Sequence, residues 1–304
     1  MYAVIDIGSN TMRLNIYEHK NNKLYLILSK KITAGLAGYV NKKGNLTKKG
    51  VDVAIDSLKE FKMILNHINV NKTYVFATAS LRNVNNSKRV TRIIEEKTKL
   101  NIDLISGKEE ATLGYIGASM MLTLDDGLLI DIGGGSTELV LYEKGKVKQA
   151  RSLSIGSLSL YKKYITNFLP TEKEIMKIRK NVLKNLRELD DYIEPAHTEL
   201  ICGVGGTIRA TRELNNDLFS NVEYNKQIET QHLKELFNLY LNESHQFIKT
   251  IIKVAPDRLH TILPGMIILD TLANHYNSKV IEVSDFGIRE GYLYTMINKE
   301  WGEK

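Results

Sequence analysis

The stretch LLIDIGGGSTELV, at residues 128–140, decides the fold, because it repeats a pattern that opens the chain as AVIDIGSNTMRLN at residues 3–15. In each copy, an apolar run of strand-forming residues contains an aspartate near its end. A tight turn rich in Gly, Ser, Asn or Thr follows, and then a second strand-like run begins. Asp6 and Asp131 are 125 positions apart (131 minus 6). The repeat predicts two related halves, each starting with a strand, a turn and a strand.

The residues between the two copies predict an α/β order. From residue 50 to 68, apolar side chains recur at three- and four-residue steps, as on the buried face of a helix. Residues 74–77 predict a strand, a short amphipathic helix around Val90 and Ile94 follows, and residues 103–105 predict another strand. Residues 111–124 are uncharged and predict a buried helix.

The second half continues the alternation of strands and helices. Thr171 and Glu174 form the sequence signature of a capping box, which predicts a helix start. The apolar stripe of that helix consists of Ile175, Ile178, Val182, Leu186, Leu189 and Ile193. Residues 199–202 then predict a strand, residues 203–207 a glycine-rich turn, and residues 208–214 a helix.

Length and composition favour two globular domains in the cytoplasm. The chain has 304 residues, 43% of them apolar, and four prolines, so it is too apolar to be disordered. The uncharged run at residues 111–124 is shorter than the roughly 20 residues of a membrane-spanning helix. The chain enters a strand at Tyr2 with no basic leader, which predicts a cytoplasmic protein without a membrane partner. Cys202, the single cysteine, is predicted to lie in a buried strand.

The net charge suits an acidic partner but decides little by itself. The formal charge is +7, from 42 basic and 35 acidic residues, but the lysines are scattered along the chain. The 15 tyrosines are not interleaved with a basic patch, so no DNA or RNA partner is expected. The seven histidines lack the spacing of zinc ligands.

Three turns are candidates for phosphate binding, because a turn rich in Gly, Ser and Thr can direct several backbone N–H groups to one point. The third turn also precedes a predicted helix, whose N-terminus attracts anions. It lacks the Lys-Ser/Thr of a Walker A loop. Each hairpin turn alone also fits an ordinary β-hairpin. The candidate residues are Gly8, Ser9, Asn10 and Thr11, then Gly133, Gly134, Gly135 and Ser136, and finally Gly205, Gly206 and Thr207.

Acidic side chains stand beside these turns. Asp6 and Asp131 fall at the ends of apolar strands, where a buried charge usually needs a metal ion or hydrogen bonds. A hard cation beside the phosphates would meet that need. The neighbouring Glu109 and Glu110 project from a predicted first helical turn, where acidic residues are also common as partners of the helix dipole.

Six motifs, in order and over nearly the whole chain, resemble those of the exopolyphosphatase and guanosine pentaphosphate phosphatase (Ppx/GppA) family. They are DIGSN (6–10), ATASLR (77–82), SGKEEA (106–111), DIGGGSTE (131–138), GVGGT (203–207) and IREG (288–291). The resemblance implies an actin-like (ASKHA, ribonuclease H-like) α/β fold with two domains and an active site in the cleft between them. The domains expected are 1–122, joined by the last residues 296–304, and 123–295.

The resemblance also implies roles for individual residues. Glu110 is implied to be the general base that activates water. Asp131 and Glu138 are implied to hold Mg²⁺, with Asp6 nearby, and Arg82 to contact a phosphate. The implied substrate is inorganic polyphosphate, the implied reaction is removal of its terminal phosphate, and a homodimer is compatible with the family.

Two departures and two open assignments accompany the resemblance. The family often carries an arginine where this chain has residues 33–36, so one phosphate contact is missing or supplied elsewhere. The chain also ends soon after the IREG motif and so resembles the short members, which lack a helical C-terminal extension. Arg289 and Glu290 fit an ion pair as well as a substrate contact, and they are not counted among the catalytic residues.

Three other functions are compatible with parts of the pattern. A guanosine pentaphosphate 5′-phosphatase would use the same base and metal, and no residue separates it from an exopolyphosphatase. A non-catalytic phosphoanhydride or nucleotide sensor would keep the turns, but Glu110, Asp131 and Glu138 argue against it. A kinase of the same superfamily is disfavoured by the carboxylates at residues 106–111.

Overall fold

The structure is a computed structural model, and it describes residues 1–189, 199–219 and 225–302. It divides into two compact units: unit 1 comprises residues 1–113 and 288–304, and unit 2 comprises residues 114–287. The sequence had placed these divisions at residues 122 and 295. In the structure the chain passes from unit 1 to unit 2 within helix α4 (Gly107–Ser119). Because the boundary lies inside a continuous helix, the sequence has no Gly-, Ser- or Pro-rich linker there that would mark it.

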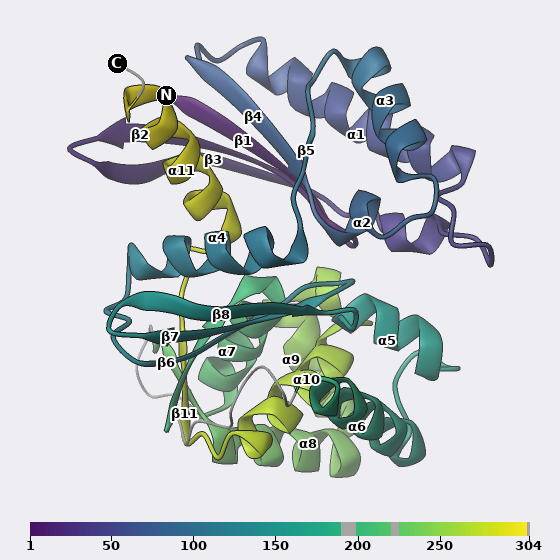
Figure 1. The fold of residues 1–304 in the computed structure, drawn as a ribbon. Helices are drawn as coiled ribbons and strands as arrows, with labels where there is room; N and C mark the ends of the chain where they lie inside the picture. The colour runs from purple at the N-terminus through teal and green to yellow at the C-terminus, as the bar shows by residue number, and fades with distance from the viewer. Residues whose placement is uncertain (190–198, 220–224, 303–304) are drawn as a thin grey trace. The chain divides into compact units, whose positions relative to one another are not determined.

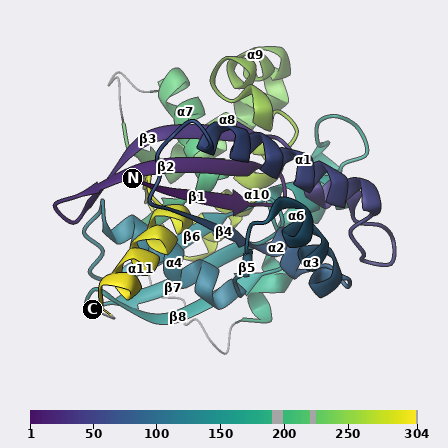
Figure 2. The same ribbon diagram turned by 90° about the horizontal axis from the view of Figure 1, so that it is seen from above.

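Unit 1 is built on a five-stranded sheet in the order β3-β2-β1-β4-β5. Figures 1 and 2 show helices α1 and α3 on one face of this sheet and the last helix, α11, on the other. The predicted apolar face of α1 is buried, with Leu58 and Phe61 fully inaccessible. The elements are β1 (Tyr2–Ile7), β2 (Met12–Lys20), β3 (Lys23–Ile32), η1 (Leu36–Tyr39), α1 (Lys48–Leu65), β4 (Lys72–Ala77), α2 (Ala79–Arg82), α3 (Ser87–Thr98), β5 (Asp103–Leu104), the first part of α4, and α11 (Ile288–Gly302).

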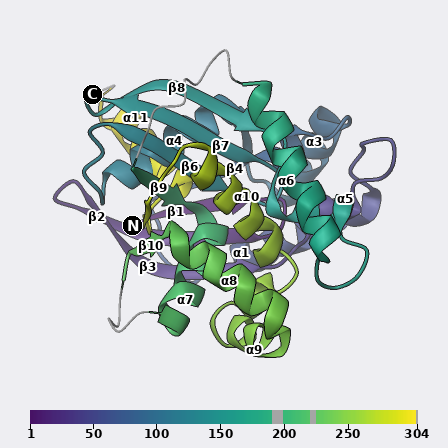
Figure 3. The same cartoon turned by 90° about the horizontal axis from the view of Figure 1, so that it is seen from below.

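Unit 2 is built on a six-stranded sheet in the order β10-β11-β9-β6-β7-β8. Its core helix α10 is buried along nearly its whole length and packs between α6 and α8 (Figure 3). The elements after α4 are β6 (Gly127–Ile132), β7 (Thr137–Glu143), β8 (Lys146–Leu153), α5 (Ser157–Tyr164), α6 (Glu172–Arg187), β9 (Leu200–Val204), α7 (Gly205–Phe219), β10 (Gln227–Glu229), α8 (Thr230–Asn242), α9 (Ser244–Val254), η2 (Pro256–Arg258), α10 (Ile262–His275) and β11 (Val280–Val283).

The predicted duplication of the two halves is confirmed by their topology. In unit 1, β1 pairs antiparallel with β2 and parallel with β4; in unit 2, β6 pairs antiparallel with β7 and parallel with β9. In each unit the third strand has a bulge: Ile27 of β3 is the extra residue opposite Ile16 and Tyr17 of β2, and Lys148 of β8 is the extra residue opposite Leu141 and Tyr142 of β7. The positions on β2 and β7 that face these bulges are also 125 positions apart (141 minus 16), so the repeat includes an irregularity that local residue preference does not require.

The predicted helices and strands are present, with shifts at their ends. The helix expected over residues 111–124 ends at Ser119, and the stripe residue Ile193 lies outside the described residues. Cys202 is buried in β9, as expected. In the described residues, no helix is long and apolar enough to cross a membrane.

The predicted capping box at the start of α6 is confirmed. The N–H of Glu174 donates to Thr171 Oγ1 at 3.3 Å, while Glu174 Oε2 accepts from the N–H and hydroxyl of Thr171 at 2.8 and 3.0 Å. The other carboxylate oxygen accepts two further bonds from Thr166. These bonds, led by that of the Thr171 N–H, lower the pKa of Glu174 to about 2 from its ordinary value of 4.5.

We predict that Glu174→Gln destabilises the protein most at neutral pH. The ionised carboxylate stabilises the fold fully above pH 4.5, and this contribution is lost as the pH falls from 4.5 through 2, because the folded-state pKa is the lower one. The variant should therefore lose about 1–3 kcal/mol at pH 7 and much less near pH 2. Urea unfolding at several pH values measures the difference, and Glu172→Gln, an exposed residue of the same helical turn, is the control. A loss independent of pH would contradict the assignment.

Candidate active site

The first turn, at Gly8–Thr11 of unit 1, directs amide groups to one side. Its carbonyls are bonded from the other side: Gly35 N–H donates to Asn10 O at 2.8 Å, and Ala37 N–H donates to Ser9 O at 3.0 Å. A trans peptide points its C=O and the following N–H in opposite directions. The N–H groups of Asn10 and Thr11 therefore face away from residues 35–37, as in an anion-binding nest.

A side-chain donor is added to this turn by Asn10. Asn10 is 8% exposed, and among the described residues its Nδ2 has no hydrogen-bond partner. A buried N–H₂ group without a partner is costly, and a phosphate oxygen is an acceptor that would satisfy it. Gly8 closes the turn by donating its N–H to Thr11 O at 3.1 Å, and a Cβ at position 8 would lie 2.7 Å from that same oxygen. The first turn thus fits a phosphate.

The matching turn of unit 2 has the same construction. Gly133 N–H donates to Ser136 O at 2.9 Å, as Gly8 does to Thr11. The carbonyls of Gly133 and Gly134 accept from the first N–H groups of α5, at 2.9 to 3.0 Å, so the N–H groups of Gly134 and Gly135 face the opposite way. Gly156 makes this contact feasible, because a Cβ there would lie 2.5 Å from the carbonyl carbon of Gly134.

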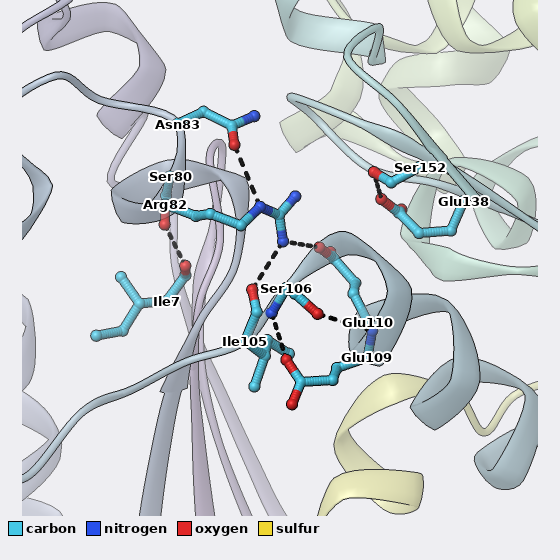
Figure 4. Close-up of polar contacts among 10 residues, drawn as sticks. All are labelled: Ile7, Ser80, Arg82, Asn83, Ile105, Ser106, Glu109, Glu110, Glu138 and Ser152. Atoms are coloured by element: carbon cyan, nitrogen blue, oxygen red, sulfur yellow. Dashed lines mark hydrogen bonds and ion pairs between the residues drawn. The ribbon is translucent and has the colours of Figure 1, made fainter. Parts of the chain in front are cut away.

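Arg82 and Glu110, from α2 and α4 of unit 1, form an ion pair (Figure 4). Arg82 Nη1 donates to Glu110 Oε2 at 2.7 Å and to the carbonyl of Ile105 at 3.0 Å, while Arg82 Nε donates to Asn83 Oδ1 at 3.2 Å. The two side chains are 20% and 11% exposed, so the pair is shielded from water but accessible at one edge. The structure therefore brings together the predicted base and the predicted phosphate-binding arginine.

The two neighbouring carboxylates of α4 have different partners. Glu109 accepts a hydrogen bond from the N–H of Ser106 at 2.7 Å, and its own N–H donates to Ser106 Oγ at 3.2 Å, which caps the helix. These bonds lower the pKa of Glu109. Glu110, one residue later on the helix, instead faces Arg82. Geometry thus gives Glu109 a structural role and leaves Glu110 as the carboxylate beside a cation.

Asp6, at the end of β1, is a buried carboxylate beside two arginines. Burial raises the pKa of its carboxyl group, and the charges of Arg289 and Arg13 act in the opposite direction. Arg289 Nη1 lies 3.7 Å from Asp6 Oδ2. The other oxygen, Oδ1, lies 3.8 Å from the position that a Cβ of Gly8 would occupy, so it is the oxygen on the side of the first turn.

Asp131 and Glu138 of unit 2 are direct cross-strand partners on β6 and β7. Residues opposite each other in a sheet project from the same face with Cβ atoms about 5 Å apart. Glu138 is 1% exposed, and its Oε1 accepts a hydrogen bond from Ser152 Oγ of β8 at 2.7 Å (Figure 4). Two like charges in this arrangement repel each other, and a cation between them would relieve the repulsion.

The third predicted turn is a single-residue junction. Strand β9 ends at Val204 and helix α7 begins at Gly205, so the helix starts three residues earlier than the sequence predicted. Gly205 has φ of +91°, and a Cβ there would lie 2.1 Å from Asp131 Oδ1. The junction therefore brings the start of α7, whose first N–H groups have no partner within the helix, close to Asp131.

The other two residues of this junction differ in what they contact. A Cβ at Gly206 would lie 2.1 Å from Nη2 of Arg258, so the guanidinium of η2 rests against the helix start. Thr207 is 2% exposed, and its methyl group packs against Gly265 of α10.

The residues present fit a magnesium ion coordinated by few protein ligands. Mg²⁺ is usually held by one or two carboxylates, with waters and substrate phosphates completing the shell. Asp131 and Glu138 supply two carboxylates on one face of the unit 2 sheet. Among the described residues, no group of three or more His, Cys, Asp or Glu side chains forms a ready-made metal cluster. Asp6 belongs to unit 1 and is described with that unit.

Sequence reasoning missed three side chains of these sites. Arg258 and Ser152 lie outside the six motifs, and only the fold brings them to Gly206 and Glu138. Arg289 belongs to a motif, but its contact with Asp6 joins residues 283 positions apart (289 minus 6). Local spacing carries no signal for such contacts.

Comparisons of this chain with known proteins agree on one family. The Ppx/GppA phosphatase family model matches residues 15–300. A putative exopolyphosphatase of Haemophilus influenzae is 24% identical over 296 residues, which cover 97% of this chain and 90% of that protein. A bifunctional 3-dehydroquinate synthase/phosphatase of Fusobacterium nucleatum is 29% identical over 302 residues; the match covers 93% of this chain but 44% of that protein, so this chain spans less than half of that relative.

A solved structure has the same fold. The Ppx/GppA family member of Aquifex aeolicus superposes with a TM-score of 0.79 at 27% sequence identity, and the match covers 98% of each chain. Its similarity extends over both units.

We predict that Gly205→Ala disrupts the unit 2 site. The substitution adds a methyl group 2.1 Å from Asp131 Oδ1 at a φ of +91°, so both the junction and the carboxylate must move. Thermal unfolding should show a melting temperature lower than that of the wild type. Gly114→Ala is the control, because its methyl would lie 4.0 Å from Asp131 Oδ2 in ordinary contact, within a helix that favours alanine. Equal behaviour of the two variants would argue against a strained junction at Gly205.

Proposed function

This chain belongs to the Ppx/GppA phosphatase family, and we propose that it is an exopolyphosphatase, which removes the terminal phosphate of inorganic polyphosphate. The observation that carries the proposal concerns the hairpin turn of each unit. The carbonyls of the turn accept hydrogen bonds on one side, so that the N–H groups of the turn point to the opposite side. Each turn by itself fits a phosphate group, and polyphosphate consists of many. The net charge of +7 also favours a polyanion.

We assign Glu110 as the general base. Its carboxylate accepts a proton from water while the water oxygen bonds to the terminal phosphorus. The bond from that phosphorus to the bridging oxygen breaks, and its electron pair remains on the shortened chain. The products are orthophosphate and a polyphosphate one unit shorter. Catalysis of this kind depends mainly on positioning and on neutralising the charge of the phosphoryl oxygens.

In the absence of substrate, the Glu110 carboxylate is paired with Arg82. A guanidinium has five N–H donors, so Arg82 can bind a phosphate with one edge while its Nη1 keeps the bond to the Ile105 carbonyl. The dianionic terminal phosphate competes with a single carboxylate for this cation. Substrate arrival would thereby release Glu110 to accept a hydrogen bond from the attacking water.

The Asp131 and Glu138 carboxylates would hold Mg²⁺, with Asp6 as a further acidic group on the unit 1 turn. Mg²⁺, when bound, neutralises phosphoryl oxygens and orients the phosphate chain. Ser152 fixes the Glu138 carboxylate through its hydroxyl, and the glycine at position 205 allows the start of α7 to approach Asp131.

We predict that Glu110→Gln lowers kcat by about 10²- to 10⁴-fold, the usual contribution of a general base, without raising KM, because the substrate no longer competes with the Glu110 carboxylate for Arg82. Phosphate release from long-chain polyphosphate with Mg²⁺ is the measurement. Glu109→Gln is the matched control: it alters the neighbouring carboxylate, which caps α4, and should change stability more than turnover. If the two variants lose equal activity, Glu110 is not the base.

The same assay, run in parallel with guanosine pentaphosphate, tests the substrate. Release from polyphosphate that disappears in Glu110→Gln supports the exopolyphosphatase. Release from the nucleotide alone would favour the alternative, a guanosine pentaphosphate 5′-phosphatase using the same groups. Binding of both compounds without release from either would overturn the enzymatic proposal and leave a non-catalytic sensor.

We predict that Arg82→Ala raises KM for polyphosphate about tenfold or more, because it removes a charge-assisted phosphate contact in a shielded position. Arg92→Ala is the control: Arg92 pairs with Glu96 at 3.1 Å on the exposed face of α3, and such pairs contribute little. A KM unaffected by Arg82→Ala would remove this residue from the substrate site.

A further inference from the structure

The first turn of the last helix contributes two buried charges to unit 1. Arg289 and Glu290 follow Ile288, where α11 begins, and the sequence left open whether they form a structural ion pair or contact the substrate. In the structure each contacts a strand of the unit 1 sheet. Arg289 lies beside Asp6 of β1, and Glu290 accepts a hydrogen bond from the hydroxyl of Tyr17 of β2.

The contact between Arg289 and Asp6 distinguishes the two oxygens of the carboxylate. Nη1 of Arg289 lies 3.7 Å from Oδ2, and both side chains are largely buried, at 13% and 17% exposure. Oδ1 lies on the side of Gly8, at the first candidate phosphate turn. An arginine charge on one oxygen fixes the rotation of the carboxylate and leaves the other oxygen directed at the turn.

A buried hydrogen-bond chain fixes the position of Arg289. Ser29 Oγ donates to Asn15 Oδ1 at 2.8 Å, Asn15 Nδ2 donates to the Tyr17 hydroxyl at 2.6 Å, and that hydroxyl donates to Glu290. Tyr17 is fully buried and Glu290 is 3% exposed. This series of hydrogen bonds joins strands β2 and β3 to the first turn of α11. Residue 289 is therefore held at the end of β1.

We propose that Arg289 is a positioning residue for Asp6, held in place by the Glu290–Tyr17 hydrogen bond, and that α11 is thereby a functional part of the site. The inference rests on the proposed function in one respect: it assumes that Asp6 helps to bind a divalent cation or orients the phosphates around that cation. Arg289 neither touches substrate nor takes part in proton transfer. Its effect is to orient the Oδ1 atom of Asp6.

The closing experiment measures binding of Mn²⁺, a paramagnetic substitute for Mg²⁺, to the full-length protein by the decrease in the free-ion resonance signal. Arg289→Met removes the charge but keeps much of the side-chain stem, and it should weaken Mn²⁺ binding about 10- to 100-fold, as loss of a supporting residue typically does. Arg289→Lys restores a cation and should recover most of the affinity, since the 3.7 Å contact does not depend on the fork geometry of arginine.

Two tyrosine variants separate positioning from stability. Tyr17→Phe breaks the bond to Glu290 and should weaken both Mn²⁺ binding and kcat/KM for polyphosphate. Tyr292→Phe breaks a second anchor of α11, the bond from Tyr292 to Asp103, and should lower the melting temperature without changing Mn²⁺ affinity. If both variants lower only the melting temperature, the positioning role is wrong.

The outcomes also distinguish this inference from the proposed function. Tighter Mn²⁺ binding in Arg289→Met would mean that Arg289 only repels the cation, and it would overturn the inference, as would a wild-type protein that binds no Mn²⁺. Weaker binding that Arg289→Lys restores would uphold the inference even if the wild type hydrolysed neither polyphosphate nor guanosine pentaphosphate. That last result would refute the proposed hydrolase alone.

Discussion

The carbonyl groups of the two hairpin turns are hydrogen-bonded from one side, and most of the candidate site depends on this constraint. In unit 1 the bonds come from the residues that follow β3, and in unit 2 from the first turn of α5, which follows β8. Because a peptide unit is planar, fixing its oxygen also fixes the N–H of the next residue. In each unit the backbone alone therefore supplies a rigid set of N–H donors that point away from these hydrogen bonds.

The charged side chains stand around these donors in a consistent way. Each turn follows an aspartate, and in each unit a basic side chain is provided by a distant segment: Arg289 for the turn of unit 1 and Arg258 for the start of α7 in unit 2. Two of the carboxylates accept a side-chain hydrogen bond: Glu138 from Ser152, and Glu110 from Arg82. Buried groups of this kind cost stability unless their hydrogen bonds are satisfied, and these bonds satisfy part of that need.

Much of the fold could be predicted because its signals are local or repeated. The strand–turn–strand copies at residues 3–15 and 128–140 predicted duplicated α/β halves, and the pairing of β1 with β2 and of β6 with β7 confirms them. The actin-like class expected from the motifs is confirmed by the agreement with the Aquifex aeolicus family member. Element ends were less predictable, since Gly205 turns the chain in one residue where a five-residue turn was expected. The roles assigned to Glu110, Asp131 and Glu138 stay predictions until they are tested.

The sequence by itself determined which residue types are available for phosphate chemistry and in what order, because strand, turn and helix preferences act over a few neighbouring residues. It could not determine which of two adjacent glutamates faces an arginine, since that depends on whether Ser106 caps the helix with Glu109. Nor could it show that Arg289 lies beside Asp6 or that Glu290 accepts a hydrogen bond from Tyr17. Only the tertiary structure decided these partners: Arg82 reaches Glu110 across 28 positions, and Arg289 and Glu290 reach β1 and β2 because α11 packs against the sheet of unit 1.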